Sequence, residues 1–296
     1  MEQMKSPSIK LKGHLEKQDY EEINGLQKYC VMEDNVTLKL ELDYKWSKAL
    51  DKSVDINRIN EFMFYDEGTL IGYIGICQFG RELEVNGMVH PEYRRMGVFN
   101  SLFSLVKDEW YKRKTTDMLL LCDNTSLPGL EFIKRTGALY DNSEYEMYLR
   151  GKPNLGSALN DLILRKAINK DAKEIARQNA MYFQVESVKE DLILPEEEAK
   201  RGVDIFIVEI DNTIIGKVHL AVNDGLGGIY GLGVLPEYRR KGYGREILMK
   251  AIDYLNERQV NKIMLQVAVK NKNALDLYKS CGFVETSKMD YYKLSK

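Results

Sequence analysis

The chain has 296 residues, of which 44% are hydrophobic and 30% are charged, and its formal net charge is −2. This composition excludes an intrinsically disordered chain, and no apolar run approaches the roughly 18 residues of a membrane-spanning helix. The near balance of 43 basic and 45 acidic residues argues against a general nucleic-acid binder, although a local basic loop can still hold a small anion. We therefore expect a globular protein with neither a nucleic-acid nor a membrane partner.

The N-terminal residues contain no apolar core of signal-peptide length, so the sequence predicts a cytoplasmic protein. The four cysteines, Cys30, Cys77, Cys122 and Cys281, are scattered singly. They form no Cys-x-x-Cys pair and no Cys/His group at metal-ligand spacing. This spacing predicts free, mostly buried thiols and no metal site.

In the first half, residues 62–65 and 72–76 have the pattern of a hairpin whose turn includes 66–68. The segment Pro91-Glu92-Tyr93-Arg94-Arg95-Met96-Gly97 then precedes apolar residues at helical spacing, namely Phe99, Leu102, Phe103 and Val106. Residues 38–58 have no obvious match in the second half, and their role stays open. The stretch 151–157 breaks all periodicity, which predicts a linker over 151–160 between domains at 1–150 and 161–296.

The second half alternates strand and helix signals. Strands are predicted at 162–165, 205–210, 214–222, 229–235 and 262–269, and helices begin at 171 and span 274–281. Between the strands 229–235 and 262–269, one face of an amphipathic helix is marked by Ile247, Leu248, Ala251, Ile252 and Leu255. Gly282 follows the last helix, where a positive φ is needed, and Phe283 is placed for the accompanying apolar contact. This alternation predicts an α/β fold with a mixed sheet.

An internal repeat relates the two halves. The segment that begins at Pro91 recurs at Pro236 as Pro-Glu-Tyr-Arg-Arg-Lys-Gly, 145 residues later. Gly72 corresponds to Gly216 at an offset of 144, and residues 132–137 correspond to 277–282 at an offset of 145. Because the register holds across most of each half, the repeat predicts two related domains of about the commonest domain size.

The loop of the second copy has the features of a phosphate site. Two glycines, Gly242 and Gly244, remove the Cβ atoms that would hold an anion off the backbone, directly before a helix N-terminus. Four cationic side chains surround this turn, so a pyrophosphate would fit. Taken alone, the tetrapeptide Arg-Arg-Lys-Gly at 239–242 would be interpreted as an exposed basic turn. It is neither a Walker A loop nor a dinucleotide fingerprint, because Ile247 stands where the third glycine would be.

In its context this loop resembles the acetyl-CoA loop of the GNAT family of N-acetyltransferases. The family's Arg-x-x-Gly-x-Gly pattern is met by Arg239, Gly242 and Gly244. The segment 271–283 is similar to the family's other signature, Asn-x-x-Ala, then Leu-Tyr, then Gly-Phe. Within it, Asn271 and Tyr278 share one helical face, with a small residue between them that leaves room for a pantetheine arm. Without the loop, Tyr278 would read as a core aromatic.

The resemblance implies two tandem GNAT-like domains, each a mixed, mostly antiparallel sheet flanked by helices. It implies an acetyltransferase, a transferase that uses acetyl-CoA as the acyl donor and a primary amine, small-molecule or peptide, as acceptor. The amine would attack the thioester directly in the C-terminal domain, and Tyr278 would assist the leaving thiolate. The residues expected to bind acetyl-CoA are Leu232, Gly233, Val234, Arg239, Arg240, Lys241, Gly242, Tyr243, Gly244, Arg245, Asn271 and Asn273.

The general base is not predicted, because the strand 229–234 carries no carboxylate. Glu209 and Glu186 are conceivable bases on neighbouring segments, and Tyr230 is a conceivable hydrogen-bonding residue that is more often a packing residue. None of the three is chosen. The lone histidines His219 and His90 are expected to be structural or solvated.

The first half keeps Arg94 and Gly97 but has Phe99 in place of Gly244 and Ile133 in place of Tyr278. We therefore expect it to support the fold or shape the substrate site, while its own cofactor binding stays open. The rival function is a non-catalytic acyl-CoA sensor or interaction module. The acceptor and the oligomeric state are not predicted.

Overall fold

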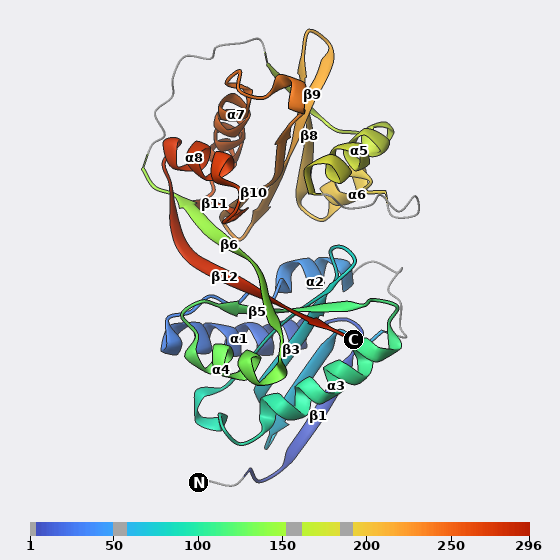
Figure 1. The fold of residues 1–296 in the computed structure, drawn as a ribbon, viewed down its shortest axis with the longest axis vertical. Helices are drawn as coiled ribbons and strands as arrows, with labels where there is room; N and C mark the ends of the chain where they lie inside the picture. The colour runs from blue at the N-terminus through green and yellow to red at the C-terminus, as the bar shows by residue number, and fades with distance from the viewer. Residues whose placement is uncertain (1–3, 50–57, 152–161, 184–191) are drawn as a thin grey trace. The chain divides into compact units, whose positions relative to one another are not determined.

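The computed structural model describes residues 4–49, 58–151, 162–183 and 192–296. It divides into two compact units (Figure 1), one made of Met1–Ser143 with Ser287–Lys296 and the other of Glu144–Thr286. The predicted linker over 151–160 lies outside the described residues, except for its first residue.

The first unit contains β1 (Pro7–Lys12), α1 (Lys17–Asp34), α2 (Leu42–Ala49), β2 (Glu61–Asp66), β3 (Thr69–Cys77), β4 (Leu83–Val89), the 3-10 turn η1 (Pro91–Tyr93), α3 (Val98–Lys112), β5 (Asp117–Asp123) and α4 (Leu127–Thr136). The second contains β7 (Ile163–Lys166), η2 (Asn169–Asp171), α5 (Ala172–Phe183), α6 (Pro195–Lys200), β8 (Val203–Ile210), β9 (Thr213–Asn223), β10 (Leu226–Val234), η3 (Pro236–Tyr238), α7 (Tyr243–Glu257), β11 (Lys262–Ala268) and α8 (Lys272–Ser280). Two long strands, β6 (Leu139–Leu149) and β12 (Phe283–Ser295), each contribute residues to both units.

Each unit has a mixed sheet, as predicted. The strand order is β1-β2-β3-β4-β5-β12 in the first unit and β7-β8-β9-β10-β11-β6 in the second. Within the units, among the described residues, only the β4/β5 pair and the β10/β11 pair are parallel. The hairpins predicted from the repeat are β2 with β3 and β8 with β9. The mixed, mostly antiparallel sheet flanked by helices is thereby confirmed.

Alternation along the strands divides each core into two layers. In β8, Phe206 and Val208 pack in the cluster that contains α7 and α8, whereas Ile205 and Ile207 pack with Ile175 of α5. Figure 1 shows α7 and α8 on one face of this sheet and α5 and α6 on the other. A strand turns successive side chains to opposite faces, so each face acquires its own helical cover.

The last strands of the two halves exchange units. In β6, residues 144–148 pair with β11 of the second unit, whereas residues 289–295 of β12 pair with β5 of the first. The sequence-based boundary would place residues 287–296 in the second domain, and the contacts place them in the first unit. A repeat fixes only local register, so it does not show which sheet a terminal strand joins.

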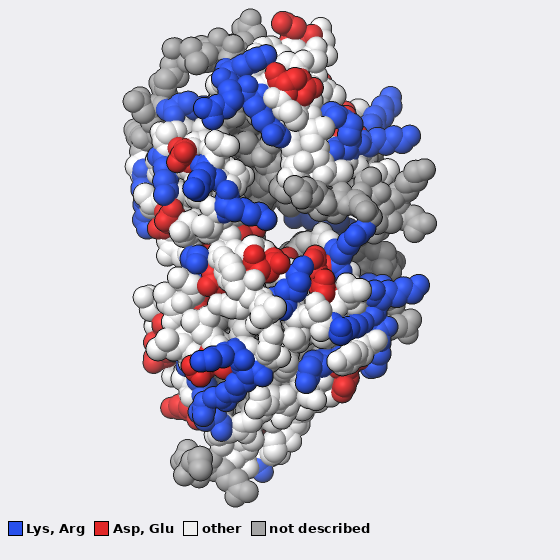
Figure 2. Space-filling view, in the orientation of Figure 1, with Lys and Arg blue, Asp and Glu red and all other residues white. Residues whose placement is uncertain are grey.

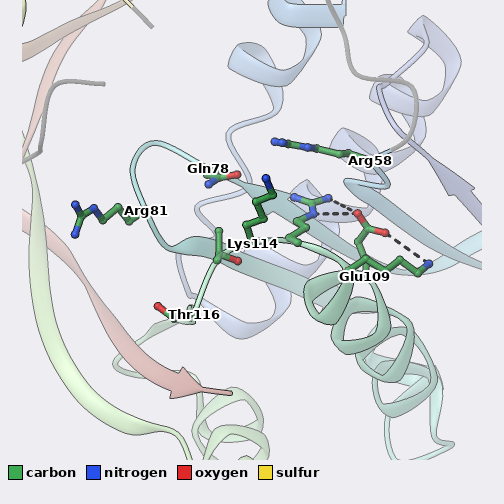
Figure 3. Close-up of a pocket in the computed structure, with 9 residues that line it drawn as sticks. Arg58, Gln78, Arg81, Glu109, Lys114 and Thr116 are labelled. Atoms are coloured by element: carbon green, nitrogen blue, oxygen red, sulfur yellow. Dashed lines mark hydrogen bonds and ion pairs between the residues drawn. The ribbon is translucent and has the colours of Figure 1, made fainter. Parts of the chain in front are cut away.

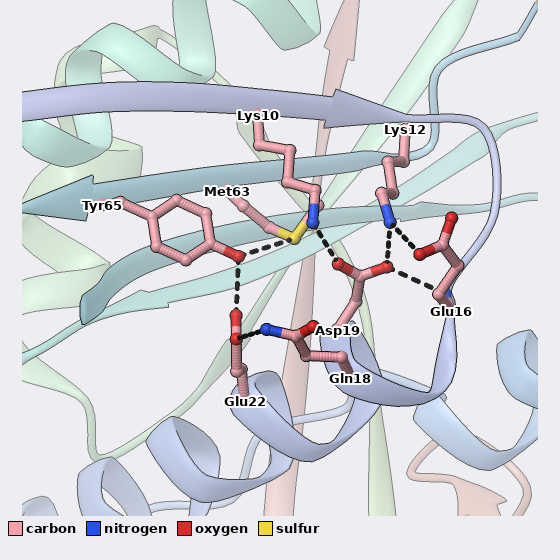
Figure 4. A network of polar contacts seen from close by, with 8 residues as sticks. All are labelled: Lys10, Lys12, Glu16, Gln18, Asp19, Glu22, Met63 and Tyr65. Carbon is pink, nitrogen blue, oxygen red and sulfur yellow. Dashed lines mark hydrogen bonds and ion pairs between the residues drawn. The ribbon is translucent and has the colours of Figure 1, made fainter. Parts of the chain in front are cut away.

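A buried carboxylate ties β1 to α1 in the first unit (Figure 4). The side chain of Asp19 is fully buried, and its two oxygens accept hydrogen bonds from Lys10 at 2.7 Å and Lys12 at 2.5 Å. It also accepts from the backbone N–H of Glu16 at 2.8 Å, which caps the helix. Burial alone would raise the pKa of Asp19, but the two lysine hydrogen bonds hold it below its usual value.

Within the described residues, no helix is both long and apolar enough to cross a membrane. The prediction of free, mostly buried thiols is confirmed, since Cys30, Cys122 and Cys281 are buried and unbridged and Cys77 is partly buried.

Candidate functional site

A β-bulge interrupts β10 in the second unit, just before the repeated loop. Tyr230 pairs with His219 and Gly233 pairs with Lys217, so three steps along β10 face two steps along β9. Gly231, within the bulge, has a φ of 55°. The pairing of β10 with β11 runs from Leu226 to Ile229, although β10 continues to residue 234. The bulge therefore leaves backbone groups of β10 outside the ladder.

Both glycines of the bulge are needed for steric reasons. A Cβ atom on Gly231 would lie 3.0 Å from the ammonium nitrogen of Lys217, at a positive φ that side chains rarely adopt. A Cβ atom on Gly233 would lie 2.1 Å from a ring carbon of Tyr182 of α5. The bulge therefore packs against Lys217 of β9 and against Tyr182 of α5.

Replacing Gly233 with alanine is expected to destabilise the second unit by about 1–3 kcal/mol, the usual cost of forcing a packed core apart. The Tyr182 ring must move, because the new methyl group would overlap it. Differential scanning calorimetry measures the effect as a lower Tm. Gly80→Ala is the control, since a Cβ atom there would meet nothing within 4 Å. Equal Tm values for the two variants would contradict this account of the bulge.

The loop between η3 and α7 has backbone N–H groups directed outward. Gly242 is the N-cap of α7 with a φ of 88°, and Arg240 also has a positive φ, 64°. The N–H groups of Gly242, Tyr243 and Gly244 donate no hydrogen bond to any described residue. A Cβ atom on Gly244 would lie 3.3 Å from Leu277 of α8. Unpaired N–H groups at a helix N-terminus favour an anion.

The cationic side chains of the loop do not all face the same way. Arg239 donates through Nε to the carbonyl of Val234 at 2.9 Å, and Lys241 lies over the ring of Tyr238. Arg240 donates to Oδ1 of Asn273 at 3.4 Å, so these two predicted ligands are brought together.

Arg245 instead reaches the C-terminal end of α8, where it contacts Ser280 Oγ at 3.1 Å. On the face that Figure 2 shows, Lys and Arg side chains gather over α7 and α8.

Helix α8 carries the second predicted cluster. Asn271 is its N-cap, and its side chain accepts a hydrogen bond from the N–H of Ala274 at 3.3 Å. Tyr278 is 8% exposed and packs near Phe283, with ring centroids 6.2 Å apart. Burial raises the pKa of Tyr278 to about 12. Its hydroxyl makes no hydrogen bond to another described residue, so this donor is available.

The other conceivable residues are placed elsewhere or are engaged. Glu209 accepts from Arg165 at 3.0 Å in an ion pair, and Glu186 lies outside the described residues. Tyr230 is 41% exposed and its hydroxyl donates to the sulfur of Met264 at 3.6 Å. His90 stacks on a tyrosine ring in the first unit.

Sequence reasoning missed a buried pair opposite the bulge. Lys217 of β9 is fully buried, donates to the carbonyl of Gly231 at 3.0 Å and lies 3.2 Å from Nε2 of His219. Burial lowers the pKa of Lys217 to about 7. Burial, together with the charge of Lys217, also lowers the pKa of His219 well below its usual value. The alternation of the two residues on one strand was visible, but the bulge that they face was not.

The first unit repeats the loop but not the bulge. Arg95 and Gly97 have φ values of 65° and 87°, close to those of their counterparts. However, β4 pairs with β3 without a register shift from Glu84 to Val89. The guanidinium of Arg94 is held by Asp34, with Nη1 2.9 Å from Oδ1. The loop conformation is thus shared, whereas the opened strand is confined to the second unit.

Phe99 turns away from the loop of the first unit. Its ring lies 4.6 Å from that of Phe132 in an edge-to-face arrangement. Both rings pack against the cluster that contains Leu102 and Val106 of α3. A bulky residue is therefore tolerated at this position because it joins the core.

A cavity of about 710 Å³ lies in the first unit (Figure 3). Its lining includes Arg58, Arg81, Lys112, Arg113 and Lys114. Glu109 bonds Arg113 at 2.9 Å, and none of the predicted site residues lines this cavity. No group of three or more metal-ligating side chains occurs among the described residues.

Comparisons with known proteins point to one family. Residues 155–283 match the model of the acetyltransferase (GNAT) family. A mycothiol acetyltransferase of Renibacterium salmoninarum is 35% identical over 86 residues, 26% of this chain and 25% of that protein. Another, from Stackebrandtia nassauensis, is 24% identical over 249 residues, 77% of this chain and 80% of that protein. The matched stretch thus spans a quarter of the first relative.

A solved structure shows the same fold over both units. It is described as a tandem GNAT protein from the clavulanic acid biosynthesis pathway, and it matches with a TM-score of 0.70 and 12% identity. The match covers 98% of each chain. At this identity the likeness shows the fold alone, which is the tandem arrangement predicted from the repeat.

Proposed function

Because residues 155–283 match the model of the acetyltransferase (GNAT) family, we propose that the protein transfers an acetyl group from acetyl-CoA to a primary amine in its second unit. The observation that carries this proposal is the β10 bulge directly before a loop with outward N–H groups. The first unit has the loop without the bulge, so it serves as support.

The donor fits the described residues in three places. The N–H groups of Gly242, Tyr243 and Gly244 would hold the pyrophosphate, with Arg240 and Lys241 beside them. The pantetheine arm would follow the part of β10 that has left β11. The acetyl carbonyl would then meet backbone N–H groups of the bulge, at 232–234, which would stabilise charge that develops on its oxygen.

The amine nitrogen would attack the thioester carbon, forming the C–N bond while the C–S bond breaks. The hydroxyl of Tyr278 would donate a hydrogen bond to the developing thiolate. We infer a small-molecule amine as acceptor, because the relative that matches over 80% of its length is named a mycothiol acetyltransferase, not a protein acetyltransferase. A cytoplasmic location is consistent with this chemistry.

The function is tested by incubating the protein with acetyl-CoA and a panel of amines and measuring release of free thiol. We expect thiol release that depends on one class of amine, with a matching acetylated product by mass spectrometry. Tight binding of acetyl-CoA with no acetylated product would favour the rival function, a non-catalytic sensor. The absence of both would contradict the proposal.

The location of the donor site is tested by calorimetry of CoA binding. Gly244→Leu is expected to weaken binding by about 10-fold or more, as lost hydrogen bonds to a charged group cost roughly 1.5–3 kcal/mol each. The leucine would crowd Leu277 and cover the N–H groups. Phe99→Gly, at the matching position of the first unit, should leave CoA affinity unchanged. The reverse ranking would move the site to the first unit.

A further inference from the structure

A buried lysine, Lys217, lies against the β10 bulge, where the proposed reaction would release a proton. Nζ of Lys217 lies 3.0 Å from the carbonyl oxygen of Gly231 and 3.2 Å from Nε2 of His219. It also lies over the ring of Tyr182 of α5, at 5.8 Å from the centroid. In the pairing of β9 with β8, Lys217 lies opposite Ile207 and His219 lies opposite Ile205. Two cationic groups this close in a buried site repel each other strongly.

The pair lies on the face of the sheet that α5 covers. Val218 and Leu220 of β9 pack into the cluster of α7 and α8, so the alternate residues Lys217 and His219 face the opposite side. Tyr230, which pairs with His219 across the bulge, is partly open to solvent on β10. An amine that approaches from this face would meet His219 before the buried lysine.

We propose that Lys217 and His219 hold one proton between them and act as the proton acceptor for the attacking amine. The inference rests on the proposed function and supplies the base that the strand 229–234 lacks. The same observations assign different parts to the two residues, because His219 is partly exposed whereas Lys217 is fully buried. His219 contacts the amine, and Lys217 acts through His219.

The proton balance closes in three steps. The substrate ammonium gives one proton to Nδ1 of His219, and the proton on Nε2 passes to the neutral amine of Lys217. The neutral substrate amine attacks the thioester carbon, and the C–S bond breaks. The second proton that the nitrogen loses goes to the thiolate, and Lys217 later releases its proton through His219 to solvent. No other reactant is needed.

The two units support this assignment by contrast. Gly72 and Gly216 are equivalent positions, so Tyr73 stands in place of Lys217 and Gly75 in place of His219. In the first unit a Cβ atom on Gly75 would lie 2.5 Å from the hydroxyl of Tyr73, which leaves no room for an imidazole. The second unit has both the β10 bulge and the Lys217–His219 pair. The first unit has a continuous pairing of β3 with β4 and neither residue.

The pair can accept a proton only while Lys217 is neutral, and this requirement sets the pH dependence of the reaction. The pKa of Lys217 is lowered to about 7, so above this pH the pair can accept a proton and below it Lys217 is already protonated. We therefore expect kcat/KM to fall as the pH decreases through about 7. The charged and titratable groups near the pair also include Arg239, whose guanidinium lies 6.0 Å from the centroid of the Tyr182 ring.

The decisive variant is Lys217→Gln, which keeps a donor for the Gly231 carbonyl but has no amine to accept a proton. We expect its kcat/KM at pH 8 to fall by about 100-fold, the typical value of general base catalysis, and the decline near pH 7 to disappear. The KM for acetyl-CoA should stay within about threefold. Tyr73→Phe, at the equivalent position of the first unit, should keep the wild-type pH profile. A Lys217→Gln protein with wild-type rate and profile would reduce Lys217 to a support of the bulge.

A titration followed by NMR tests the shared proton without any turnover. The chain has three histidines, so the His219 ring signal is assigned with His219→Asn. Its pKa should lie well below 6.5 in the wild type and rise by about one pH unit in Lys217→Gln, because the neighbouring charge is gone. An unchanged titration would overturn the inference. A wild type that acetylates no amine would overturn the proposed function, and the titration would still decide whether the pair shares a proton.

Discussion

A Tyr278→Phe protein is expected to bind acetyl-CoA like the wild type and to turn over about 100-fold more slowly, the usual loss for one donor at a developing anion. The pKa of Tyr278 is raised to about 12, so its hydroxyl is protonated throughout the working pH range. It is a weaker acid than a thiol of pKa about 8.5, and it therefore donates a hydrogen bond to the thiolate and keeps its proton. Calorimetry and steady-state kinetics separate the two effects.

The matched control is Tyr254→Phe, which removes a hydroxyl from α7 that is bonded to Asp204. This variant should keep wild-type turnover, because Tyr254 packs against Phe206 on β8, not on the loop or α8. The fold should also tolerate Tyr278→Phe, since the hydroxyl that is lost makes no hydrogen bond among the described residues. Unchanged turnover in Tyr278→Phe, or an equal loss in Tyr254→Phe, would remove the role given to Tyr278.

A Lys45→Met protein is expected to lose about 3–5 kcal/mol of stability in the first unit, the cost of stranding a buried charge. Lys45 of α2 lies 2.9 Å from Oε2 of Glu61, which also accepts from the hydroxyl of Tyr73 at 2.5 Å. All three residues are at most 8% exposed. Without the lysine, the Tyr73 hydroxyl is the one hydrogen-bond donor that Glu61 keeps among the described side chains.

Urea denaturation followed by tryptophan fluorescence measures this loss, because both tryptophans, Trp46 and Trp110, belong to the first unit. Lys5→Met breaks the ion pair with Glu67, whose side chains are 72% and 56% exposed, and should cost at most about 1 kcal/mol. Adding Glu61→Gln to Lys45→Met should restore part of the stability. Equal midpoints for Lys45→Met and Lys5→Met would contradict a structural role for the buried pair.

The sequence predicted the repeated frame because that frame is local. Apolar spacing located α7, and the turn signals located the two hairpins at nearly their observed bounds. Gly282 was predicted to need a positive φ, and its φ is 94°. The crossing of β12 into the first unit was not predictable, because it depends on pairing between residues that lie more than 160 positions apart.

The site was predictable only in part, for a similar reason. The bulge in β10 was not predicted, because the number of residues on each side of it is a property of two strands together. Lys217 was not singled out either, because its burial depends on Tyr182 of α5 and on Gly231. The burial of the side chains in the Lys-Val-His stretch at 217–219 therefore depends on long-range packing.

The exchange of β6 and β12 between the units has a consequence during synthesis. Strand β5 is completed at residue 123, but the strand that pairs with it in the first unit begins contributing at residue 287. At about 5–20 residues per second, the ribosome needs roughly 10 to 30 s to make the intervening chain. Throughout that interval β5 presents an open sheet edge, the kind of surface that invites pairing with other chains. The half that is made first is therefore the half that must wait to finish folding.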